Sequence, residues 1–129
     1  EILIDEDTAG SNLIINGTFD ADTDWTKQAA WTISGGEAHC NTAGTDFIYQ
    51  DINMQIGSTY RITYDVTAYT SGQIRVEVDS VVFGTWRTTT GTYIEDLTPT
   101  AATTNRPLWR NLVGGGFIGS IDNITVVKL

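Results

Sequence analysis

The sequence is poor in the residues that form disulfides, metal clusters and nucleophilic sites. Of its 129 residues, only Cys40 is a cysteine and only His39 is a histidine. One thiol excludes an intrachain disulfide and a cysteine metal cluster, so we expect Cys40 to be buried without a chemical role. His39 is expected at the surface, on the opposite face of the same short strand. The sequence has no Gly-x-Ser-x-Gly, no His-Glu-x-x-His and no phosphate loop, so no familiar motif indicates an enzyme.

Basic charge and long apolar runs are also scarce. Sixteen acidic residues against seven basic ones give a net charge of −9. Such a field repels phosphate backbones, so nucleic acid is an unexpected partner. No apolar run approaches ~18 residues, which argues against membrane insertion. The sequence does not begin with Met, and we expect residues 1–11 to be a linker or tail of a longer polypeptide, ahead of one domain over residues 12–129.

Helix signals are nearly absent, whereas short alternating runs separated by Gly, Asn, Asp and Ser are frequent. This pattern predicts an all-β fold, an antiparallel β-sandwich or jelly roll. The clearest strand is 59–69, in which Tyr60, Ile62, Tyr64, Val66 and Ala68 are expected to face the core. Ile74, Val76 and Val78 form the next inward face, and the two strands are predicted to pair as a hairpin. Further strands are expected at 31–33, 37–40, 47–52, 93–97, 108–113 and 121–127.

Each end of the sequence carries a short apolar strand with an acidic residue at its edge. The first is Asn12-Leu13-Ile14-Ile15-Asn16-Gly17-Thr18-Phe19-Asp20, and the last is Gly119-Ser120-Ile121-Asp122-Asn123-Ile124-Thr125-Val126-Val127. A sandwich that places these strands side by side would bring Asp20 and Asp122 together. Two neighbouring carboxylates repel unless a proton or a cation lies between them, which suggests calcium.

This pair of ends resembles those of galactose-binding-like carbohydrate-binding modules. These are jelly rolls attached to xylanases and cellulases and also found in phage tail and head-fibre proteins. The resemblance implies a structural calcium held by Asp20 and Asp122, with carbonyls from the loop 16–18. Asp20 stands where the family usually has Glu, and Asp22 and Asp24 are nearby alternatives.

Sugar modules bind through aromatic rings laid against pyranose faces, so the important question is which aromatic residues face outward. The aromatic residues expected in the core are Phe19, Trp25, Trp31, Tyr60, Tyr64 and Phe117. The predicted ligand-binding residues are Tyr49, Tyr69, Trp86, Arg87 and Trp109. Trp86 lies in a polar, threonine-rich stretch that offers it no apolar neighbour; the alternative is that it packs on another subunit or on the rim.

Two functions follow as expectations. The first is a non-catalytic carbohydrate-binding module that recognises a glycan on a preformed surface. The alternative is a structural or adhesin module of a phage virion, contacting other subunits or a host surface. Either would act outside the cell or at the virion surface. A glycosidase with an acidic pair also remains open, because spacing along a sequence does not determine spacing in the fold.

Overall fold

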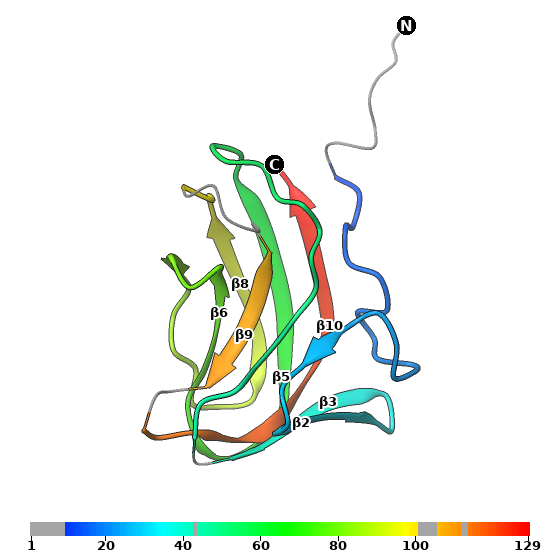
Figure 1. Ribbon diagram of the computed structural model, residues 1–129, viewed down its shortest axis with the longest axis vertical. Coiled ribbons are helices and arrows are strands. Elements are labelled where there is room, and N and C mark those ends of the chain that lie inside the picture. The colour runs from blue at the N-terminus through cyan, green and yellow to red at the C-terminus, as the bar shows by residue number, and fades with distance from the viewer. Residues whose placement is uncertain (1–9, 43, 101–105, 112–113) are drawn as a thin grey trace, which may run out of the picture.

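The structure is a computed structural model that describes residues 10–42, 44–100, 106–111 and 114–129 (Figure 1). The described residues form an all-β fold, and among them no helix is long and apolar enough to cross a membrane. The ten strands in this part of the chain are β1 (Thr26–Lys27), β2 (Trp31–Ser34), β3 (Glu37–Thr42), β4 (Phe47–Tyr49), β5 (Tyr60–Gly72), β6 (Ile74–Val78), β7 (Val82–Phe83), β8 (Gly91–Leu97), β9 (Pro107–Asn111) and β10 (Phe117–Lys128).

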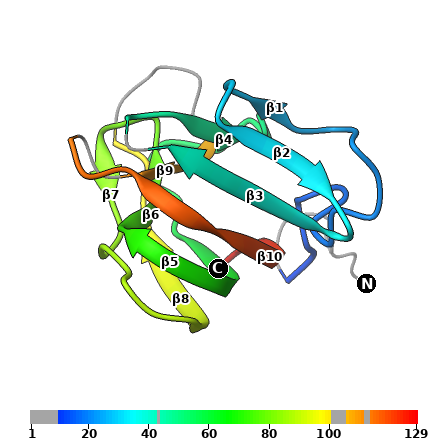
Figure 2. The ribbon, with the colours of Figure 1, turned by 90° about the horizontal axis from the view of Figure 1, so that it is seen from below.

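Two five-stranded antiparallel sheets pack face to face, as the predicted sandwich requires (Figure 2). One has the order β1-β4-β9-β6-β7 and is called the β9 sheet after its central strand; the other has the order β2-β3-β10-β5-β8 and is called the β10 sheet. The strands expected at 31–33 and 37–40 form a hairpin around Gly35 and Gly36, because β2 pairs with β3 from Trp31 opposite Cys40 to Ser34 opposite Glu37. Predicted strand residues 112 and 113 lie outside the described residues.

The core prediction is confirmed at every named position except Ala68, which is exposed. Tyr60, Ile62, Tyr64, Val66, Ile74, Val76 and Val78 are all buried, and so are the predicted core residues Phe19, Trp25, Trp31 and Phe117. Cys40 is buried as expected, and burial raises the pKa of its thiol to about 12, with the charge of Asp46 adding to the effect. A thiol with so high a pKa stays protonated at neutral pH and is a poor nucleophile.

The predicted hairpin between β5 and β6 is wrong. β5 pairs with β10 and β8, whereas β6 pairs with β9 and β7, so the chain crosses from one sheet to the other after Gly72. Gly72 has a φ of 84°, and a Cβ there would collide with the carbonyl of Gly116. Alternation indicates which face of a strand is buried, but two apolar faces can meet across the sandwich as well as within one sheet.

The N-terminal segment lies beside the last strand, as expected from the two end motifs (Figure 1). Asn12 forms an isolated bridge with Val127, and the Leu13 amide donates to the Val126 carbonyl at 2.8 Å. The Ile124 amide donates to the Gly17 carbonyl at 3.0 Å. The segment therefore pairs with the C-terminal half of β10 without forming a regular strand of its own.

Candidate functional site

The outer face of the β9 sheet carries a set of aromatic side chains. Cross-strand register places Phe47 opposite Arg110 and Tyr49 opposite Leu108, while Glu77 lies between Leu108 and Phe83. Since side chains alternate along each strand, these residues share the face turned away from the core. We call this surface the aromatic face; its rings are Phe47, Tyr49, Phe83 and Trp86.

Arg75 joins the two aromatic residues at one end of this face. Its guanidinium carbon lies 4.1 Å from the ring centroid of Phe83 and 4.1 Å from that of Trp86. Both distances are within the range of cation–π attraction. Phe83 remains 49% exposed and Trp86 is half-buried. The arginine therefore fixes both rings in place while leaving ring surface open to solvent.

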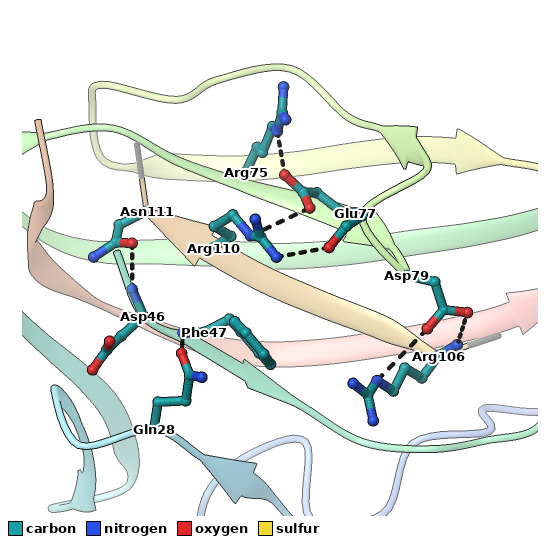
Figure 3. Close-up of polar contacts among 10 residues, drawn as sticks. Gln28, Asp46, Phe47, Arg75, Glu77, Asp79, Arg106, Arg110 and Asn111 are labelled. Carbon is teal, nitrogen blue, oxygen red and sulfur yellow. Dashed lines mark hydrogen bonds and ion pairs between the residues drawn. The ribbon is translucent and has the colours of Figure 1, made fainter. Parts of the chain in front are cut away.

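A buried carboxylate pairs with two arginines at the centre of the aromatic face. The Glu77 side chain is only 1% exposed and accepts a hydrogen bond from Arg75 Nε at 2.7 Å. Arg110 Nε lies 3.5 Å from the other carboxylate oxygen, and the Arg110 guanidinium is 5.3 Å from the Phe47 ring centroid. Figure 3 shows Arg75 of the same strand, β6, and Arg110 of the adjacent strand, β9, both directed at Glu77. A buried charge needs such partners, because desolvation without them is costly.

A second ion pair supports Tyr49 at the other end. The guanidinium of Arg106 lies 3.6 Å from the Tyr49 ring centroid. Its Nε is 3.6 Å from Asp79 Oδ1, and Figure 3 shows this ion pair. Tyr49 also packs on Phe47, with ring centroids 5.8 Å apart. Each ring described on the aromatic face is thus braced by an arginine, a neighbouring ring or both.

The structure brings together two of the five residues predicted to bind ligand. Tyr49 and Trp86 both lie on the aromatic face. Arg87 does not join them, because it pairs with inward-facing Ile74 and its side chain turns to the opposite side of the chain. There its Nη2 donates to Glu95 at 2.8 Å, and its guanidinium lies 4.3 Å from the Tyr93 ring centroid. Arg87 therefore links the edges of the two sheets.

The predicted outward orientation of Trp109 and Tyr69 is wrong. Trp109 is fully buried, and it is Leu108 and Arg110 that share the outer face. Simple alternation along β5 would turn Tyr69 away from the core, but the register of β5 against β10 shifts between Ala68 and Val66. This bulge leaves Ala68 exposed and turns Tyr69 toward the core, where it packs against Phe117 with ring centroids 6.4 Å apart. A bulge reverses the alternation beyond it.

Sequence reasoning missed most of what surrounds Tyr49 and Trp86. Phe47, Phe83 and the arginines Arg75, Arg106 and Arg110 were not singled out as ligand-binding residues. A signal was present: Phe47 and Tyr49 alternate with the core residue Ile48, and Arg75 alternates with Ile74 and Val76. What the sequence does not contain is the pairing order that places these segments side by side.

The predicted metal ligands lie in the loop before β1, which holds Asp20, and on β10, which holds Asp122. Burial raises the pKa of Asp122, and the charges of Glu37, Asp65 and Asp20 raise it further. Asp20 is exposed, accepts a hydrogen bond from Thr18 Oγ1 at 3.0 Å, and lines a cavity of about 410 Å³ between the first loop and β10. Among the described residues, no three His, Cys, Asp or Glu side chains are grouped to hold a metal. Calcium at this position stays a prediction.

Calcium and pH are expected to act on stability through Asp122. A carboxyl group whose pKa is raised on folding destabilises the fold at neutral pH, and this effect disappears as pH falls below the unfolded pKa. Asp122→Asn should therefore raise the Tm at pH 7 without calcium, and raise it less at pH 3. If calcium binds here, calcium chloride should raise the Tm of the parent protein and not that of the variant.

The matched control is Asp51→Asn, which changes one exposed carboxylate elsewhere. A parent protein whose Tm is the same in calcium and in EDTA would contradict the calcium site. The Tm gain of Asp122→Asn should be larger at pH 7 than at pH 3. If this difference is no greater than that of Asp51→Asn, the unfavourable effect of the Asp122 charge on stability is contradicted.

In sequence, the chain matches no protein-family model and no curated protein. In structure, it is similar to a solved protein described as "CBM4 structure and function", with a TM-score of 0.62 and 19% identity over 90% of this chain and 99% of that one. It is also similar to the N-terminal cellulose-binding domain of β-1,4-glucanase C from Cellulomonas fimi, with a TM-score of 0.55 and 15% identity over 87% of this chain and 93% of that one. At these identities the likeness shows the fold, a β-sandwich shared with carbohydrate-binding modules.

Proposed function

We propose that this chain is a non-catalytic carbohydrate-binding module that takes a glycan on the aromatic face. The observation that carries the proposal is the set of partly exposed rings of Phe47, Tyr49, Phe83 and Trp86 on one face of one sheet. Exposed aromatic side chains gathered on a rigid sheet suit stacking on the apolar faces of sugar rings. The fold is that of solved carbohydrate-binding modules, including one described as cellulose-binding.

Binding without catalysis agrees with the state of the carboxylates on this face. A glycosidase needs one carboxyl group that donates a proton and a second that acts as base or nucleophile. Glu77 is in ion pairs with Arg75 and Arg110, and Asp79 pairs with Arg106. Both carboxylates are thus engaged by arginine partners within the protein. Polymeric glycans are found mainly outside cells, so the proposed place of action is extracellular. The structures compared above give no support to a virion role.

Trp86→Ala is expected to weaken glycan binding several-fold or more, because ring stacking contributes about 0.5–1.5 kcal/mol beyond the area it buries. The fold should be nearly unchanged, since Trp86 is half-buried on the outside of the β9 sheet. Binding is measured by affinity electrophoresis in gels containing soluble β-glucans, xylans and other polysaccharides, and stability by thermal unfolding.

Ile94→Ala is the control, because Ile94 is 57% exposed on the other sheet. Retardation that is equal for the parent, Trp86→Ala, Tyr49→Ala and Ile94→Ala would place glycan binding elsewhere. No retardation of the parent by any polysaccharide would contradict the proposed function itself.

A further inference from the structure

Positive charge is concentrated on the aromatic face of an otherwise acidic chain. Arg75, Arg106 and Arg110 are three of only seven basic residues, and Glu77 and Asp79 are the carboxylates paired with them. Three cations against two anions leave this cluster with a net charge of +1, whereas the whole chain carries −9. Binding a glycan that carries only neutral hydroxyl groups does not require such an excess of cations in the protein.

Arg75 has donors available for a ligand. Its Nε donates to Glu77, but its two terminal nitrogens make no hydrogen bond with the described residues. Figure 3 shows these nitrogens on the side of the guanidinium away from Glu77. The side chain is 20% exposed, and the rings of Phe83 and Trp86 both lie against the guanidinium. A guanidinium held in this way loses little rotamer freedom when it binds an anion.

We propose that the aromatic face selects an acidic glycan, with Arg75 donating both terminal N–H groups to a uronate carboxylate while Phe83 and Trp86 contact the sugar rings. This inference rests on the proposed function, which it narrows to one class of ligand. A planar guanidinium matches a carboxylate in a two-bond geometry, and such charge-assisted pairs are stronger than hydrogen bonds to neutral hydroxyls. Glu77 is engaged on the opposite side and orients the guanidinium without covering its terminal nitrogens.

The charge of the rest of the chain does not prevent this binding. At physiological ionic strength the Debye length is about 8 Å, so a carboxylate at Arg75 interacts mainly with the cluster around it. Repulsion from the remaining acidic surface acts on more distant charges of a ligand. The arrangement therefore suits a glycan with isolated uronate residues better than one with a carboxylate on every sugar.

The experiment compares pairs of polymers that differ only in the carboxylate. Glucuronate-bearing xylan and alginate are each tested beside their carboxyl-reduced forms, in which CO₂⁻ has become CH₂OH. We expect the parent protein to bind glucuronate-bearing xylan at least tenfold more tightly than the reduced form, and this preference to weaken between 50 and 500 mM NaCl. Arg75→Gln should reduce the ratio to about threefold or less while binding of the reduced polymer persists. Arg75→Lys, which keeps the charge but not the planar fork, should give an intermediate ratio.

Arg61→Gln is the control, because Arg61 pairs with Asp96 on the exposed face of the β10 sheet. Equal binding of acidic and reduced polymers by the parent would overturn the preference for uronate and leave the proposed function standing. A preference that survives in both Arg75 variants, with thermal unfolding unchanged, would overturn the role of Arg75. Failure to bind any polymer of either kind would overturn both proposals.

Discussion

Replacing Trp109 by alanine is expected to lower the free energy of unfolding by about 3–5 kcal/mol, the range for deleting a large buried aromatic side chain. Trp109 is fully buried in the central strand of the β9 sheet. Its ring contacts Trp25 and Tyr64 edge-on, with centroid distances of 5.8 and 5.9 Å, so it connects the N-terminal loop with the β10 sheet. Its removal leaves a cavity that rigid strands on both sides cannot close.

Trp109→Phe is the informative companion variant. The Trp109 Nε1 is buried without a hydrogen-bond partner among the described residues. Phenylalanine keeps part of the packing and removes this unsatisfied donor, so we expect it to cost less than half as much as alanine. Urea unfolding monitored by circular dichroism measures both. A Trp109→Ala variant as stable as the parent would mean that the ring is not in the core. If that variant also lost glycan binding, Trp109 would be a ligand-binding residue.

Glu77→Gln is expected to destabilise the fold by about 3 kcal/mol, the lower end of the range for breaking a buried ion pair. The substitution keeps the shape of the side chain but leaves two guanidinium groups without their anion. The lower end applies because the arginine side chains are 20% and 22% exposed and gain some solvation. For a domain of this size the Tm should fall by roughly 10 °C.

A double-mutant cycle separates the ion pair from other effects of the glutamate. In a background with Arg75→Gln and Arg110→Gln, Glu77→Gln should cost much less than in the parent, because no unpaired cation remains. An equal cost in both backgrounds would show that the glutamate acts through its packing. The same variants should disturb Phe83 and Trp86, whose positions depend on Arg75.

The local features of the fold could be predicted because alternation reports burial directly. Tyr60, Ile62, Tyr64 and Val66 are buried at every second position, as their pattern indicates. The pairing of strands could not be predicted, because β5 and β6 are adjacent in sequence yet belong to different sheets. The bulge that turns Tyr69 inward depends on the register of β5 against β10, which no pattern within β5 contains.

The candidate site was only partly predictable for the same reason. Trp86 was found because a tryptophan in a polar stretch is conspicuous in any fold. The outward face of Glu77 follows from the inward face predicted for Ile74, Val76 and Val78, but its burial results from two arginines. One of them, Arg110, is on β9, which is adjacent to β6 in the sheet but distant in sequence. Trp109 was misassigned because both Leu108 and Trp109 are buried, one on each side of β9, and a strand that is buried on both faces shows no alternation.

The position of β10 at the centre of its sheet has a consequence for folding. β10 is the last strand in sequence, yet it lies between β3 and β5, which precede it by tens of residues. Neither neighbour can complete its hydrogen bonds until Phe117–Lys128 has left the ribosome, and both must remain apart until then. Such distant pairings raise contact order and slow folding. The chain should thus fold late, in one cooperative step, and expose its unpaired strand edges to chaperones during synthesis.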